Sequence, residues 1–168
     1  MTQPPEKSRG AQTTRPQKLV YIIEDDPALA SHFARTLSSH RTETFTNGID
    51  AIKRIDKQLP DAILLDIILD GPSGFSLLHE LQSYTDTARI PIVVCSSIDL
   101  TDHDLASYGV THILDKTTMH PTDLIEVVNS ISERRGAVGR ADSFRAPHVE
   151  GRHGFPSKAE QKRSAPHA

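Results

Sequence analysis

The sequence predicts an α/β fold in which a five-stranded parallel sheet is covered by helices on both faces. Between residues 18 and 135, five short strand-like runs alternate with five helix-like segments. Most of these runs are apolar along their whole length, which is typical of strands buried on both faces. Alternating strands and helices favour parallel pairing through right-handed helical crossovers.

Capping and turn residues mark the first two strand–helix units. Residues 19–23 form an apolar strand, and Asp26 is well placed to cap a helix that begins with the following proline. This helix has one apolar stripe, made of Leu29, Phe33 and Leu37. The second strand, at 43–45, is weak and ends at a turn of Asn47 and Gly48. The second helix stops before a proline, and its apolar residues are Ile52, Ile55 and Leu59.

The third strand ends in an acidic residue. Residues 62–65 form this strand, and Asp66 lies at its carboxyl end. Ser73 can cap the third helix, because its hydroxyl can accept from a free N–H of the first turn. The apolar residues of that helix are Phe75, Leu78 and Leu81. The fourth strand is expected at 90–95.

The last two helices differ in how strongly the sequence predicts them. Thr101 and Asp104 form a possible capping box for a fourth helix that ends before Gly109, but this segment is the least apolar of the five. The fifth strand is expected at 110–114, and Pro121 then begins a fifth helix. The apolar residues of that helix are Leu124, Val127, Val128 and Ile131.

Two terminal segments, 1–17 and 136–168, lack apolar periodicity, so we expect both to be disordered. The segment 18–135 is then the single folded domain. The C-terminal segment holds six basic and three acidic residues, and its 33 residues are too few and too polar to form another domain. We therefore expect no DNA-binding or other output domain after residue 135.

Charge and cysteine content restrict the possible partners and compartment. Residues 18–135 hold eighteen acidic and ten basic residues, so nucleic acid, itself negatively charged, is a poor partner. The single cysteine, Cys95, excludes a disulfide within the chain. The sequence has neither a secretory h-region nor a run near the ~20 apolar residues that a membrane span needs. We expect a cytoplasmic protein without a membrane span.

Polar residues follow four of the five expected strands. Glu24 and Asp25 follow the first, Asp66 ends the third, Ser96 follows the fourth and Lys116 follows the fifth. Because parallel strands end at a common edge, these side chains should lie close together. Three neighbouring carboxylates repel one another unless a cation joins them, and their oxygens suit Mg²⁺. A lysine and a hydroxyl opposite them would bind a phosphoryl group, so the pattern predicts a phosphoryl-transfer site.

The segment LVYIIEDDP at 19–27, followed at their spacings by Asp66, Ser96 and Lys116, resembles the receiver domain of bacterial two-component response regulators. The resemblance covers about residues 18–135. It implies the flavodoxin-like receiver fold, with strand order 2-1-3-4-5. Because we expect no output domain after residue 135, we expect a stand-alone, single-domain response regulator.

The resemblance assigns roles to the acidic residues. Asp66 would accept a phosphoryl group from a phosphohistidine on a sensor histidine kinase or a histidine phosphotransfer protein. Asp25 and Asp66 would bind Mg²⁺ (or Mn²⁺) directly, and Glu24 would assist through a water molecule. The backbone carbonyl of Ile68 would complete the protein ligands of the cation.

The same resemblance implies how the phosphoryl group is held and read. Ser96 would hydrogen-bond it, and Lys116 would pair with Asp66 or with the phosphoryl oxygens. The chain would be a signalling protein, which at most catalyses its own phosphorylation and dephosphorylation. Its output would be contact with a downstream target protein, through the face made by the expected fourth helix, fifth strand and fifth helix.

Departures from the family pattern leave two other functions open. Asp70 stands where the family often has proline, Thr117 stands where it usually has proline, and Ile113 replaces its switch aromatic. The last two favour a degenerate receiver that acts as an interaction module without phosphorylation. An aspartate-nucleophile phosphohydrolase has similar chemistry, but it needs a second acid two residues after the nucleophile, where Ile68 stands.

Two apolar residues lead to an expectation about the lifetime of the phosphorylated form. Ile68 and Ile98 occupy positions that in this family influence the attacking water. Neither side chain can orient a water molecule by hydrogen bonding. We therefore expect phosphorylated Asp66 to hydrolyse slowly for a receiver.

Overall fold

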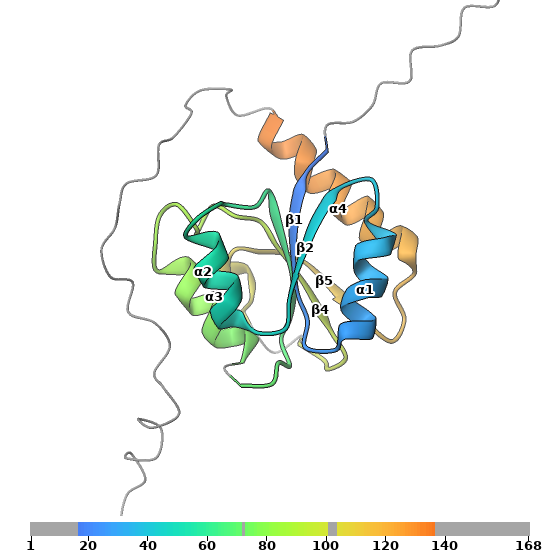
Figure 1. The fold of residues 1–168 in the computed structure, drawn as a ribbon, viewed down its shortest axis with the longest axis horizontal. Helices are drawn as coiled ribbons and strands as arrows, with labels where there is room; N and C mark the ends of the chain where they lie inside the picture. The colour runs from blue at the N-terminus through green and yellow to red at the C-terminus, as the bar shows by residue number, and fades with distance from the viewer. Residues whose placement is uncertain (1–16, 72, 101–103, 137–168) are drawn as a thin grey trace, which may run out of the picture.

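A parallel sheet forms the centre of the protein. The computed structural model describes residues 17–71, 73–100 and 104–136, without the side chains of 132–136. All neighbouring strands pair in parallel, in the order β2-β1-β3-β4-β5 (Figure 1). The predicted strand order and direction are therefore confirmed. The strands are β1 (Leu19–Ile23), β2 (Arg41–Phe45), β3 (Ala62–Asp66), β4 (Ile92–Ser96) and β5 (Val110–Asp115).

Helices cover both faces of the sheet, as predicted. Helices α1 (Pro27–Thr36) and α4 (Pro121–Gly136) pack on one face. Helices α2 (Gly48–Ile55) and α3 (Gly74–Gln82) pack on the other (Figure 1). A short 3₁₀ turn, η1 (Ala106–Tyr108), lies between β4 and β5. Its residues pack beside α3.

Alternation along the strands divides the apolar interior into two cores. In β1, Tyr21 and Ile23 pack toward α2 and α3, whereas Val20 and Ile22 pack toward α1 and α4. All four side chains are fully buried. A strand with both faces buried reads as a continuous apolar run, which explains why the sequence located β1 and β3 so well.

The predicted caps of α1 and α3 are confirmed. Oδ1 of Asp26 accepts hydrogen bonds from the backbone N–H groups of Ala28 at 2.7 Å and Leu29 at 3.2 Å. The hydroxyl of Ser73 accepts from the N–H of Ser76 at 3.4 Å. Each cap fixes where its helix begins, and both helices begin beside the carboxyl edge of the sheet.

Two details of the second unit were predicted wrongly. Asn47 is not a turn residue but the cap of α2, because its side chain accepts from the N–H of Asp50 at 2.9 Å. Gly48 is consequently the first residue of that helix. Leu59 lies beyond the end of α2 and is 44% exposed. The proline at position 60 disfavours a helical conformation for the residue before it.

The predicted fourth helix is wrong for the part of it that the structure describes, residues 104–109. These residues form only the turn η1, and Gly109 ends it with a φ of 75°. Leu100 and Leu105 are both buried but stand five positions apart, so they would not share one face of a helix. Thr101, the expected cap, lies outside the described residues.

One face of β5 is partly uncovered. Ile113 lies opposite Val94 in the sheet, on the side where Val94 is buried, yet Ile113 is 50% exposed. Leu114 points to the other side and packs with α1 and α4. The predicted signalling face therefore consists of η1, β5 and α4.

The terminal segments predicted to be disordered, 1–17 and 136–168, lie outside the described residues except for Gln17 and Gly136. The proposed domain limits of 18 and 135 stay a prediction. In the part of the chain that is described, no helix has the length and apolar composition needed to cross a membrane.

Because α3 approaches the end of β3 closely, adding one methyl group at Gly74 should destabilise the fold. A Cβ at Gly74 would lie 2.6 Å from the backbone oxygen of Asp66 and 2.6 Å from Cα of Ile67. Since both atoms belong to the backbone, the loop must shift. Gly74→Ala should lower the free energy of unfolding, measured with urea, by about 1–3 kcal/mol.

Gly48→Ala is the matched control, because Gly48 also begins a helix. A Cβ there would meet only the side chain of Leu77, at an ordinary contact distance of 3.6 Å. Its effect should stay within about 0.5 kcal/mol. Equal destabilisation by the two substitutions would contradict the close contact at Gly74.

Candidate functional site

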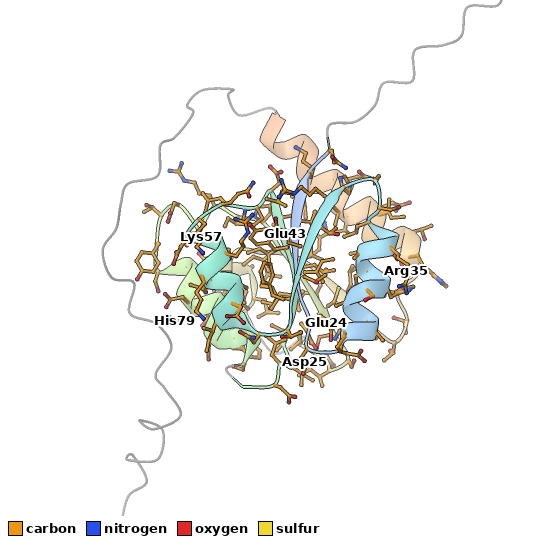
Figure 2. All side chains as sticks on the ribbon, in the orientation of Figure 1. Glu24, Asp25, Arg35, Glu43, Lys57 and His79 are labelled. Atoms are coloured by element: carbon orange, nitrogen blue, oxygen red, sulfur yellow. The ribbon has the colours of Figure 1, made fainter. Side chains whose placement is uncertain are left out.

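The residues predicted to carry the chemistry reach the same edge of the sheet. Glu24 and Asp25 directly follow β1, and Asp66 is the last residue of β3. Figure 2 shows Glu24 and Asp25 at the lower end of the view, where β1 leads into α1. Ser96 ends β4 and Lys116 follows β5. The parallel topology alone accounts for this gathering of residues up to 92 positions apart.

Lys116 links two of the acids. Its Nζ lies 2.7 Å from Oδ2 of Asp66, to which it donates a hydrogen bond. It lies 2.7 Å from Oε2 of Glu24 as an ion pair, without the angle of a hydrogen bond. Glu24 is 2% exposed and Asp66 is 5% exposed. One ammonium group therefore joins the ends of β1 and β3 where solvent screens charges little.

Burial and neighbouring charges shift the pKa values of Glu24 and Lys116. Burial raises the pKa of the Glu24 carboxyl, and the charge of Asp66 raises it further, against the attraction of Lys116. For Lys116, burial alone would lower the pKa. Its hydrogen bond to Asp66 and its attraction to both acids outweigh burial and raise that pKa. Lys116 therefore stays charged at neutral pH.

Asp25 adds a third carboxylate to the cluster. One oxygen atom from each of Glu24, Asp25 and Asp66 lies within 4.8 Å of the other two. Three carboxylates and one ammonium leave two negative charges when all are ionised, and a divalent cation would neutralise them. Since all the donors are oxygen atoms and Asp25 is half-exposed, the group fits a hard cation such as Mg²⁺.

The loop between β3 and α3 is attached to two of these carboxylates. The N–H of Ile68 donates to Oδ1 of Asp66 at 2.9 Å, and the N–H of Asp70 donates to Oδ2 of Asp25 at 3.0 Å. The bond from Asp70 was missed by the sequence analysis, because it joins residues 45 positions apart through a backbone group. The only signal in the sequence is that residue 70 is not proline, which has no N–H.

Ser96 is buried at the end of β4, the strand next to β3. Its Oγ accepts a hydrogen bond from the N–H of Ile98 at 3.2 Å. Its backbone oxygen accepts from the N–H of Lys116 at 2.9 Å, which ties the segment after β5 to β4. Ile68 and Ile98 are about half exposed, at 51% and 48%. Ile68 thus belongs to the loop that follows Asp66, and Ile98 belongs to the loop that follows Ser96.

Comparison with known sequences identifies one family. A model described as the response regulator receiver domain matches residues 20–129. The heme response regulator HssR of Staphylococcus aureus strain MRSA252 is 32% identical over 110 residues, which are 64% of this chain and 46% of that protein. HssR of strain JH9 is 31% identical over the same shares of both chains. The chain thus spans about half the length of the curated relatives it matches.

Solved structures share the fold. A response regulator from Chloroflexus aurantiacus has a TM-score of 0.64 and 25% identity, covering 71% of this chain and 100% of that one. A CheY-like receiver domain from Methanospirillum hungatei has a TM-score of 0.66 and 16% identity, covering 74% and 100%. The receiver domain of a Pseudomonas aeruginosa sensor histidine kinase, solved with magnesium in its active site cleft, has a TM-score of 0.62 and 22% identity, covering 70% and 99%. The last two likenesses concern the fold alone.

The raised pKa of Glu24 predicts that this acid costs stability at neutral pH. The folded protein releases the proton of Glu24 at a higher pH than the ordinary 4.5, so stability falls as pH rises from about 4.5 through the raised pKa. Glu24→Gln removes this fall. In buffer without divalent cations, the variant should be more stable than the wild type at pH 7 but not at pH 4, as measured by urea unfolding.

Glu43→Gln provides a control with the opposite sign. Arg54 hydrogen-bonds Glu43 and lowers the pKa of its carboxyl, so Glu43 contributes stability that is lost as pH falls. This variant should be less stable than the wild type at pH 7 and similar to it at low pH. If Glu24→Gln also lost stability at pH 7, the account of the buried cluster would be wrong.

Proposed function

Because the chain belongs to the response regulator receiver domain family, we propose that the carboxylate of Asp66 accepts a phosphoryl group in a two-component signalling pathway. The donor would be a phosphohistidine on a sensor histidine kinase or a histidine phosphotransfer protein. One observation carries the proposal: Asp66 lies at the end of β3 within 4.8 Å of two further carboxylate oxygens and 2.7 Å from Lys116.

The transfer places particular demands on Asp66 and Lys116. A carboxylate oxygen of Asp66 bonds to phosphorus while the bond from phosphorus to the imidazole nitrogen breaks, and the imidazole keeps the electron pair. The ammonium of Lys116 donates a hydrogen bond of 2.7 Å to Oδ2 of this carboxylate, so a positive charge lies beside the reacting group. Positioning and charge neutralisation supply most of the rate in phosphoryl transfer. After the transfer, Lys116 would pair with the phosphoryl oxygens, and Ser96 would hydrogen-bond one of them.

A divalent cation, Mg²⁺ or Mn²⁺, would complete the site. Asp25 and Asp66 would hold it directly, Glu24 would act through water, and the backbone carbonyl of Ile68 would be a further ligand. When bound, the cation would neutralise charge on the carboxylates and the phosphoryl oxygens. The excess of two negative charges in the cluster supports this assignment.

The signal would pass on through protein contact. We propose that a downstream target binds the face made by η1, β5 and α4, where Ile113 exposes half of its side chain. The chain would be no enzyme beyond its own phosphorylation and dephosphorylation.

A degenerate receiver, working without phosphorylation, is the alternative. The half-exposed Ile113 in place of an aromatic, together with Thr117 after the lysine, supports it.

Phosphorylation of Asp66 can be tested with a small donor. Incubation with acetyl phosphate and Mg²⁺ should add one phosphoryl group to the wild type, visible by intact-protein mass spectrometry, and EDTA should prevent it. Asp66→Asn should abolish the modification, because an amide oxygen cannot replace the carboxylate nucleophile. Asp26→Asn is the matched control, since asparagine still caps α1 and the substitution removes one nearby negative charge.

The outcomes separate the candidate functions. Modification of Asp26→Asn but not of Asp66→Asn supports the receiver function. An unmodified wild type supports the degenerate receiver. Rapid turnover of phosphomonoesters, with no stable modification, would instead indicate a phosphohydrolase.

The lifetime of the phosphorylated form should depend on Ile68. Its exposed apolar side chain adjoins the site and offers no hydrogen bond to an attacking water. Ile68→Asn should therefore speed the loss of the phosphoryl group by roughly tenfold, because its amide can orient water. Ile68→Val should leave the rate near that of the wild type. Equal rates for the two variants, or a wild-type lifetime at the short end of the family range, would contradict this reading.

A further inference from the structure

The loop from β3 to α3 crosses the site and donates two backbone hydrogen bonds to it. The first runs from Ile68 to Asp66, its neighbour two positions earlier, at 2.9 Å. The second runs from Asp70 to Asp25 at 3.0 Å and joins the loop to the end of β1. The two carboxylates that would hold the cation directly are thus both attached to the same three-residue stretch of the loop, residues 68–70.

Asp25 depends on this loop more than its neighbours do. Lys116 pairs with Glu24 and Asp66, and both of those acids are almost fully buried. Asp25 is only partly buried, and Oδ2 of its carboxylate accepts a hydrogen bond from the backbone N–H of Asp70. A half-exposed carboxylate without such a bond would sample several rotamers, and binding a cation would then cost the entropy of fixing one.

We propose that the backbone N–H of Asp70 is a positioning group for the cation site, which holds the Asp25 carboxylate in the orientation that binds a divalent ion. By accepting through Oδ2, Asp25 keeps Oδ1 for the ion. This inference rests on the proposed function, because it requires that the cluster binds a cation. It concerns the amide of residue 70 and not its exposed side chain.

The loop is anchored well enough to present this N–H. At its far end, Ser73 caps α3, and Gly74 packs so closely on Asp66 and Ile67 that a Cβ would not fit. The N–H of Gly74 also donates to the backbone oxygen of Ile67 at 2.9 Å. Both ends of the loop are therefore held against the end of β3, and the amide between them needs little ordering when the ion binds.

Two substitutions at one position separate the amide from the carboxylate of Asp70. Asp70→Pro removes the N–H, whereas Asp70→Asn keeps it and removes only the negative charge. The dissociation constant of Mg²⁺ can be measured by isothermal titration calorimetry on the full chain without a phosphodonor. Asp70→Pro should weaken Mg²⁺ binding roughly tenfold relative to Asp70→Asn, the value of one hydrogen bond to a charged group.

A second measurement avoids the other effects of proline on the loop. In the wild type, the Asp70 amide should exchange its hydrogen slowly by NMR, and Asp25→Ala should speed that exchange by at least roughly tenfold. The Ile68 amide, which is bonded to Asp66, is the internal reference and should change much less. This arm decides the matter if Asp70→Pro fails to fold.

The experiments distinguish failure of the cation site from failure of the positioning role of the Asp70 amide. If the wild type does not bind Mg²⁺, the cation site itself is wrong and the positioning role falls with it. If the wild type binds Mg²⁺ but Asp70→Pro and Asp70→Asn bind it equally, the positioning role is wrong and the proposed function stands. Exchange of the Asp70 amide that is unaffected by Asp25→Ala would overturn the role in the same way.

Discussion

The geometry of the site depends on one buried ammonium group, that of Lys116, whose Nζ lies 2.7 Å from a carboxylate oxygen of Glu24 and 2.7 Å from one of Asp66. Two acids that are 2% and 5% exposed would otherwise repel each other and lack solvation. Lys116 offsets one of the three negative charges that Glu24, Asp25 and Asp66 carry at this edge. Two negative charges therefore remain uncompensated at this edge of the sheet. A divalent cation can neutralise them.

The fold supplies this arrangement by simple topology. Parallel strands bring the ends of β1, β3, β4 and β5 to one edge, although their residues are far apart in the sequence. The backbone then refines the positions. Amides of the loop after β3 bind Asp66 and Asp25, and the backbone oxygen of Ser96 binds the N–H of Lys116. Glycine at position 74 lets α3 begin directly against β3, which keeps that loop short and close to the acids.

Much of this could be predicted from the sequence, because the strongest signals are local. The apolar runs located the strands, and Asp26 and Ser73 marked helix starts through hydrogen bonds within one turn. The site residues followed from the topology. The errors arose where local signals are ambiguous. Asparagine favours caps as well as turns, and a possible capping box at Thr101 and Asp104 predicted a helix in a segment whose apolar residues do not share one face. The bond from Asp70 to Asp25 had no local signal, since it depends on how a loop folds across the sheet.

The most direct test of the account is the melting temperature as a function of Mg²⁺ concentration at constant ionic strength. Circular dichroism can follow unfolding, since the chain has no tryptophan. If two uncompensated charges at the sheet edge form a cation site, the melting temperature should rise with the Mg²⁺ concentration. The rise should slow only at concentrations where Mg²⁺ also binds to the unfolded chain. A melting temperature that stays constant, or that rises equally with NaCl of matched ionic strength, would contradict the central claim.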